Sequence, residues 1–222
     1  MNALPFTAQL INVFAAVLLL LSFAMLAQRR ILSLVDLLAW QGAALVGSTL
    51  AVAYSTGQQH LYYSAALTLA LKVILVPLVL HRLIRRLAVR WDTEPLLNIP
   101  ATMIVGLALV VFSFGLAQPI SALASTVTRS TLGIAIAVVM LSFLMMITRR
   151  KAISQVIGFL AMENGLFFAA TSATYGMPMV VELGVALDVL VGVVILGIFF
   201  FQIREQFDSL DLHHLESLKE DQ

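Results

Sequence analysis

The chain has 222 residues, of which 61% are hydrophobic and only 11% are charged. That charged share is less than half of the roughly 25% found in soluble domains, which excludes a water-soluble globule. A bilayer-spanning helix needs about 20 apolar residues, so a chain of this length has room for roughly seven spans. The sequence contains no cysteine, which excludes a disulfide, a thiolate metal site and a cysteine-ligated iron–sulfur cluster within it.

Seven apolar stretches follow one another, each bounded by charge, proline or polar turns. The alternating ten-residue strands of a membrane barrel are absent, so the expected fold class is an all-α integral membrane protein. No small-residue cleavage site follows the first stretch, which is therefore expected to be a retained span and not a signal peptide. The predicted spans cover residues 8–27, 31–53, 61–83, 99–117, 131–147, 152–173 and 179–201.

The basic residues between the spans predict the orientation. The loops on one side carry a single basic residue, Arg129, between the fourth and fifth spans. The other side carries the rest, because Lys and Arg follow the odd-numbered spans. These residues are Arg29, Arg30, Arg82, Arg85, Arg86, Arg90, Arg149, Arg150, Lys151, Arg204 and Lys219. The positive-inside rule then predicts an N-terminus outside and a C-terminus in the cytoplasm.

An internal repeat accompanies this pattern. Residues 66–80 align with residues 182–196 without a gap and with five identities, and the segment ending at Gln41 aligns with the one ending at Glu163. We expect a parallel duplication of a three-helix unit, with the fourth span returning the chain across the bilayer. The expected regions are a first unit (1–83), a basic cytoplasmic loop with the linking span and an outer loop (84–130), a second unit (131–203) and an acidic cytoplasmic tail (204–222).

Charged residues interrupt the apolar spans. Lys72, Glu163 and Asp188 lie near the middle of the third, sixth and seventh spans, while Glu182 and Asp36 are shallower. A charge at the centre of a membrane helix costs about 2.5–3.5 kcal/mol on insertion scales. Burial disfavours the charged form of such groups and an opposite charge favours it, so they can exchange protons near neutral pH. These five residues are therefore the candidates for a proton relay.

Other interpretations remain open at this point. Lys72 could form an ion pair with Glu163 or Asp188 that only fixes helix packing, although this leaves one central carboxyl over. A fixed cation site would need several neutral oxygen ligands, and only Asn164 adjoins Glu163. Pro77 cannot donate to the carbonyl of Val73, which predicts a kink beyond Lys72. His60 and His81, at the edges of loops, are expected to be solvated.

Three segments carry a resemblance to a known family: Leu160–Gly165 (Leu-Ala-Met-Glu-Asn-Gly), Val181–Asp188, and Lys72–Pro77. With them the chain resembles hydrogenase-4 component E, a membrane subunit of formate hydrogenlyase-type group 4 [NiFe]-hydrogenases. The last three spans are similar to the K subunit of respiratory complex I and to the C subunit of multisubunit cation/proton antiporters. In those proteins buried glutamates occupy the positions of Glu163 and Asp188.

The resemblance implies a non-redox subunit, not catalytic by itself, in a bacterial or archaeal cytoplasmic (inner) membrane. Its implied partners are antiporter-like subunits, a membrane anchor and the hydrophilic hydrogenase arm, within the lipid bilayer and without nucleic acid. No cofactor is expected in this chain, because the nickel–iron site and the iron–sulfur clusters belong to partner subunits. The alternatives are a subunit of a cation/proton antiporter or another complex I-like assembly, a purely structural assembly subunit, and an independent secondary transporter.

Overall fold

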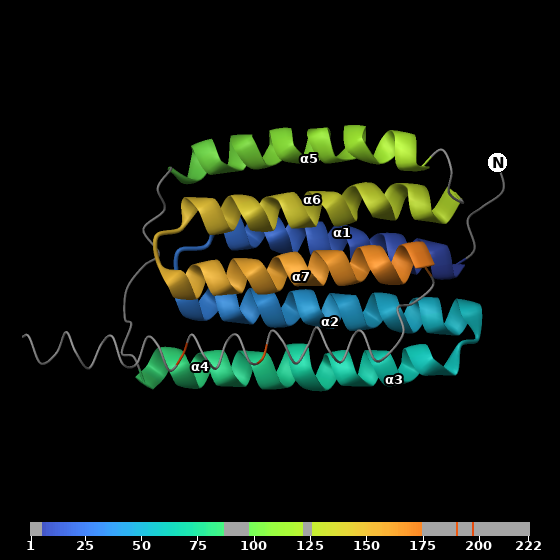
Figure 1. Ribbon diagram of the computed structural model, residues 1–222, viewed down its shortest axis with the longest axis horizontal. Helices are drawn as coiled ribbons and strands as arrows, with labels where there is room; N and C mark the ends of the chain where they lie inside the picture. Colours follow the sequence, from blue (N-terminus) through green and yellow to red (C-terminus); the bar gives the residue numbers. More distant parts are fainter. Residues whose placement is uncertain (1–5, 87–97, 122–125, 175–189, 191–196, 198–222) are drawn as a thin grey trace, which may run out of the picture.

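The computed structural model describes residues 6–86, 98–121 and 126–174, together with Leu190 and Gly197. Within these residues the chain is helical and contains no β-strand (Figure 1). The predicted seventh span lies outside the described residues apart from Leu190 and Gly197. Glu182, Asp188 and the acidic tail lie outside them as well.

Six helical stretches of the described chain are long and apolar enough to cross a membrane. Six of the seven expected spans thus correspond to helices of sufficient length and hydropathy, because long apolar runs fix where membrane helices form. The elements are α1 (Phe6–Ala27), α2 (Ile31–Thr56), α3 (Gln59–Thr68), η1 (Leu69–Leu75), α4 (Val76–Arg86), α5 (Ile99–Ser121), α6 (Thr126–Thr148) and α7 (Ala152–Thr174). Together α3, the π-helical η1 and α4 make one rod.

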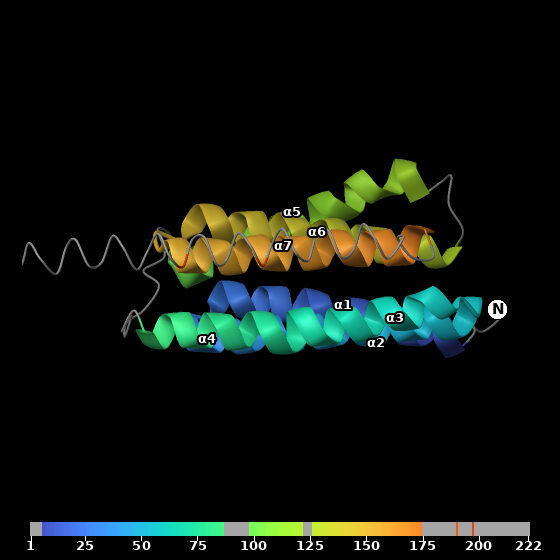
Figure 2. The same cartoon turned by 60° about the horizontal axis from the view of Figure 1, so that its bottom comes forward.

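The helices lie in two layers, as Figure 2 shows. One layer contains α1, α2 and the rod, and the other contains α5, α6 and α7. Between the layers α1 packs against α6 and α2 packs against α7. The members of each facing pair run in the same direction along the bundle (Figure 1). This face-to-face arrangement brings the second helix of the first layer against the helix that carries Glu163.

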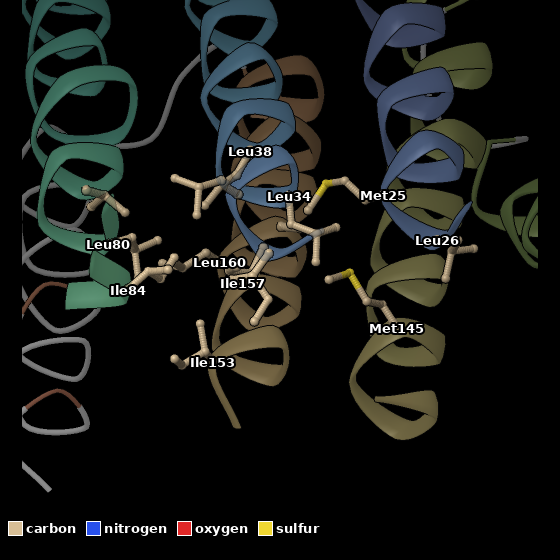
Figure 3. Close-up of a cluster of buried hydrophobic side chains, with 14 of the residues drawn as sticks. Met25, Leu26, Leu34, Leu38, Leu80, Ile84, Met145, Ile153, Ile157 and Leu160 are labelled. Carbon is tan, nitrogen blue, oxygen red and sulfur yellow. The ribbon is translucent and has the colours of Figure 1, made fainter. Parts of the chain in front are cut away.

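One end of the bundle collects the basic residues. The turn from α1 to α2, the turn from α6 to α7 and the end of α4 all lie there (Figure 1). We call it the basic end. Near it, apolar side chains from five helices form a buried cluster (Figure 3). Its members include Met25, Leu34, Leu38, Leu80, Ile84, Met145, Ile157 and Leu160.

Arg149 fastens two helices together at the basic end. It follows the last residue of α6, and its guanidinium donates to the carbonyls of Leu26 at 2.9 Å and Gln28 at 2.7 Å. The two acceptors lie at the C-terminal end of α1 and just beyond it, where the last carbonyls of a helix have no partner within the helix. Burial, and secondarily the charge of Arg29, lower the pKa of Arg149. An arginine still stays protonated, because its usual pKa is so high.

Candidate functional site

The central feature is an ion pair between the two layers. Lys72 lies midway along the rod and Glu163 midway along α7. Lys72 Nζ approaches Glu163 Oε1 to 2.5 Å, and the two side chains are only 11% and 9% exposed. Of the two partners that the sequence allowed for Lys72, the structure therefore places Glu163 in contact with it. Asp188, the other one, lies outside the described residues.

An aromatic ring completes the surroundings of the ammonium. Lys72 Nζ lies 4.7 Å from the ring centroid of Phe167, within the range of a cation–π interaction. Phe167 follows Glu163 by four residues on α7, and residues at this spacing share one face of a helix. The carboxylate and the ring thus reach the same ammonium from consecutive turns of α7.

The backbone at Lys72 is π-helical. Within η1 the hydrogen bonds span five residues, and at its end the N–H of Val76 donates to the carbonyl of Leu71. The next residue, Pro77, has no N–H to donate. The irregularity expected from the proline thus takes the form of a π-helical segment before it, with Lys72 inside that segment. Such segments inside α-helices occur frequently at functional sites.

A glycine allows α2 to approach this segment. A Cβ atom on Gly42 would lie 3.3 Å from Val73 Cγ2 and 3.6 Å from the backbone carbonyl carbon of Lys72. Side chains larger than hydrogen would therefore crowd η1 from the α2 side. The glycine lets the backbones of α2 and η1 pack closely, directly beside Gln41.

A chain of neutral polar groups runs across three helices beside the ion pair. Asn164 Nδ2 on α7 donates to Gln41 Oε1 on α2 at 3.1 Å. Gln41 Nε2 donates to Ser22 Oγ on α1 at 3.0 Å, and the Ser22 hydroxyl donates to the carbonyl of Leu18 at 2.9 Å. Gln41 is 0% exposed. A buried polar chain with its hydrogen bonds made fixes the relative position of its helices.

Three consecutive residues of the Met-Glu-Asn-Gly segment on α7 each contact a different neighbouring helix. Glu163 pairs with Lys72, and Asn164 binds Gln41. A Cβ on Gly165 would lie 2.9 Å from Val138 Cγ1 and 3.0 Å from Val139 Cγ2, so this glycine allows α7 to lie against α6. Three adjacent residues thereby join α7 to the rod, to α2 and to α6.

A small cavity borders the ion pair and the amide of Asn164. Its volume is about 10 Å³, which is close to the least that one water molecule needs. The described residues that line it are Leu38, Leu71, Lys72, Val76, Leu160, Glu163 and Asn164. Three of these side chains are polar, so the cavity offers hydrogen-bond partners at its inner side and an apolar wall elsewhere.

Asp36 lies apart from this centre. Its side chain is 64% exposed on α2, and its Oδ1 lies 3.6 Å from Nε2 of His81 on α4. His81 is half-buried, in contrast to the solvated histidine expected from its position at a loop edge. Among the described residues, no three potential metal-binding side chains of His, Asp or Glu gather in one place.

Sequence reasoning missed several residues of this site. Gln41, Ser22, Phe167 and Gly42 were not among the candidates, since neutral residues hardly change the hydropathy of a span. One signal for Gln41 was present, because the internal repeat aligns it with Glu163.

The fold and the site together define a multi-pass helical membrane protein with an ion pair buried at the centre of its bundle. The uncharacterized protein Rv0085 of Mycobacterium tuberculosis is 33% identical to this chain over 212 residues, which make up 95% of this chain and 96% of that protein. The chain therefore belongs to the same family as this mycobacterial protein.

Hydrogenase-4 component E is a second relative. The Escherichia coli protein is 28% identical over 163 residues, or 73% of this chain and 74% of that protein. Hydrogenase-4 component E of Shigella flexneri matches equally well. These matches confirm the resemblance inferred from the three motif segments. No family model matches the chain, and no solved structure matches it.

Proposed function

We propose that the chain is a multi-pass membrane subunit of a hydrogenase complex, and that Glu163 and Lys72 form part of a buried proton-translocation relay within it. The hydrogenase assignment is supported by the similarity to hydrogenase-4 component E. The relay is supported above all by one observation, the ion pair buried midway along η1 and α7. Neither residue is needed to hold a cofactor in this proposal.

The chemistry of the pair follows from its charges. With Glu163 ionised, the ammonium of Lys72 stabilises the carboxylate. A proton that arrives at Glu163 neutralises the carboxylate and removes its charge attraction for Lys72, while the weaker cation–π interaction with Phe167 remains. Lys72 can move, because its side chain is long and its backbone lies in a π-helical segment. When the proton leaves Glu163, the original pair forms again.

The wider arrangement is part of the same proposal. The chain has seven spans with the N-terminus outside, and the basic end of the bundle faces the cytoplasm of a bacterial or archaeal cell. The two three-helix units are a parallel duplication, for which the parallel facing pairs α1/α6 and α2/α7 are support. Asp188 and Glu182 continue the relay in the seventh span.

The proposed partners are antiporter-like membrane subunits, a membrane anchor and the hydrophilic arm of the hydrogenase. That arm would hold the nickel–iron site and the iron–sulfur clusters. Relay residues in the antiporter-like subunits would exchange protons with Glu163 along the plane of the membrane.

A purely structural assembly subunit is the second candidate. It is favoured by the hydrogen bonds from Asn164 to Gln41 and from Gln41 to Ser22, which show that this region also joins three helices. In that case the ion pair would only hold the rod against α7. The two candidate functions predict different proton translocation when Glu163 is replaced by a residue of the same shape that cannot bind or release a proton.

The experiment is the Glu163→Gln variant of the complete complex, reconstituted into proteoliposomes. Glutamine keeps the shape and hydrogen-bonding capacity of glutamate but cannot titrate. We expect less assembled complex by native electrophoresis, because the Lys72 ammonium loses its carboxylate. The complex that does assemble should show a large fall in protons translocated per hydrogen molecule turned over. The Glu163→Asp variant, which still titrates, should retain part of the translocation. Undiminished translocation in fully assembled Glu163→Gln complex would count against the relay and favour the structural role.

A further inference from the structure

A second acid–base pair lies between the central ion pair and the basic end. Asp36 follows the first residue of α2 by five positions, and His81 precedes the last residue of α4 by five. At 1.5 Å of rise per residue, each is about 7.5 Å from the end of its helix. The Asp36 side chain is 64% exposed and the His81 side chain 29%. The Asp36 carboxylate is thus the more exposed member of the pair, and the His81 imidazole is the more buried one.

The two ring nitrogens of His81 have different neighbours. Nδ1 lies 3.0 Å from the carbonyl oxygen of Pro77, and Nε2 lies 3.6 Å from Oδ1 of Asp36. Because a carbonyl can only accept, Nδ1 carries a hydrogen in either charge state of the ring. Nε2 is therefore the nitrogen that gains or loses the proton, and it is the one that faces the exposed carboxylate. Imidazole is the side chain suited to this exchange near neutral pH.

The helices around His81 bring few other charges to it. On α2, which packs against α4, the titratable groups are Asp36 and Tyr54, and Tyr54 lies near the other end of that helix. The only titratable group of α7 is Glu163, which pairs with Lys72. On α4 itself, Arg82 and Arg85 are exposed. Among the described residues, Asp36 is thus the acid that faces the His81 imidazole.

The cavity beside the ion pair is lined in part by α2 and α4, the two helices that carry this acid–base pair. Leu38, which follows Asp36 by two residues, lines the cavity, and so does Val76, which precedes His81 by five. The remaining separation is closed by the apolar cluster of the basic end, with Leu38 and Leu80 both almost completely buried (Figure 3). Buried apolar side chains thus lie between the acid–base pair and the central ion pair.

We propose that Asp36 and His81 are the proton-uptake site of this subunit, which takes protons from the aqueous side of the basic end and passes them inward to Glu163. A proton from water or a buffer acid first binds the Asp36 carboxylate. The two side chains then close the 3.6 Å between them to hydrogen-bond distance, and the proton moves to Nε2 of His81, which restores the carboxylate and leaves an imidazolium. The imidazolium returns to neutral imidazole when water that crosses the apolar cluster at Leu38 takes the proton from Nε2 and delivers it to Glu163, while Nδ1 keeps its hydrogen toward the Pro77 carbonyl. This inference rests on the proposed relay function of Glu163.

The test uses the whole complex in inverted membrane vesicles, with proton translocation measured in the absence and presence of imidazole in the medium. The variants are Asp36→Asn, His81→Gln and the two combined. The matched control is His60→Gln, an exposed histidine at the opposite end of the bundle. We expect the combined variant to translocate protons at least about tenfold more slowly, in line with the loss of a positioned acid–base group. Added imidazole should restore much of the rate, whereas the control should translocate normally.

Two results would overturn the inference. One is an undiminished rate in the combined variant, and the other is a reduced rate that imidazole does not restore, which indicates a positional role. Glu163→Gln, measured in parallel, separates this question from the proposed function. If Glu163→Gln abolishes translocation while the combined variant is normal, only the uptake site is wrong. If Glu163→Gln translocates normally, the relay itself is wrong.

Discussion

Lys72 is the residue on which the centre of the bundle depends most. Its ammonium meets a carboxylate and an aromatic ring from α7, and its backbone lies against Gly42 of α2. A buried pair of this kind is weak evidence for stability, because an apolar pair of similar volume often serves as well. Removal of one partner is different, since it leaves an uncompensated charge in low dielectric. Replacing both partners should therefore leave assembly nearly unchanged, whereas replacing only one should impair it.

The Lys72→Met variant should assemble poorly, and the double variant Lys72→Met/Glu163→Gln should assemble nearly as well as the wild type. The single change leaves the Glu163 carboxylate unpaired, at a cost of about 3–5 kcal/mol. The amount of assembled complex, measured in a double-mutant cycle, gives the coupling. A second cycle with Asp188→Asn serves as the comparison. Additive losses with Glu163→Gln would show that the pairing with Glu163 does not control assembly.

At the scale of elements, two glycines near the ion pair allow their helices to approach closely. Gly42 lets η1 lie against α2, and Gly165 lets α7 lie against α6. The contact at Gly165 is the tighter one, since a Cβ there would lie 2.9 Å from its nearest neighbour, against 3.3 Å at Gly42. That neighbour, Val138, is fully buried, and its β-branched side chain has little freedom to rotate away. The position of Glu163 relative to the rod therefore depends on a glycine two residues away.

The Gly165→Ala variant should be destabilised by about 1–3 kcal/mol, as expected for overpacking. The added methyl group would meet Val138 Cγ1 at 2.9 Å. Thermal unfolding of the purified complex, followed by loss of the assembled form, measures the effect. Gly115→Ala is the control, since a Cβ there has no atom within 4 Å. Val138→Ala combined with Gly165→Ala should regain part of the loss, and equal destabilisation by Gly115→Ala would contradict the packing argument.

At the scale of the whole molecule, the two layers carry the basic residues to one end. The ends of α1, α4 and α6 lie there together, although they are far apart in the sequence (Figure 1). The opposite end contains the turn at Gln58. The positive-inside rule then predicts that the basic end faces the cytoplasm. The uptake site proposed at Asp36 and His81 requires the same orientation.

A reporter fused after Gln222 should be active in the cytoplasm, and one inserted at Gln58 should be active in the periplasm. The expectation follows from nine basic residues after the first, third and fifth spans against one on the other side. Paired enzyme reporters with opposite compartment requirements make the measurement. Activity of both fusions in the same compartment would show that the number of spans is wrong.

Much of this architecture could be predicted because apolar runs fix membrane helices. The sequence also narrowed the partner of Lys72 to two acids, of which Glu163 is the one in contact. The sequence did not indicate toward which neighbouring helix each polar side chain points. Hydropathy shows how deep in the membrane a residue lies, but not which face of its helix it occupies. Asp36 was consequently predicted as a shallower relay candidate without a partner, and the structure places it opposite His81. Pro77 predicted an irregular helix, but the π-helical form depends on packing against α2.

The most direct test of the relay is the number of protons translocated per hydrogen molecule turned over by the Lys72→Met/Glu163→Gln complex in proteoliposomes. This double variant removes titration at the centre without leaving a buried charge, so assembly and relay are separated. The relay predicts a fully assembled complex in which this ratio falls well below that of the wild type. An assembled double variant that translocates protons at the wild-type ratio would contradict it.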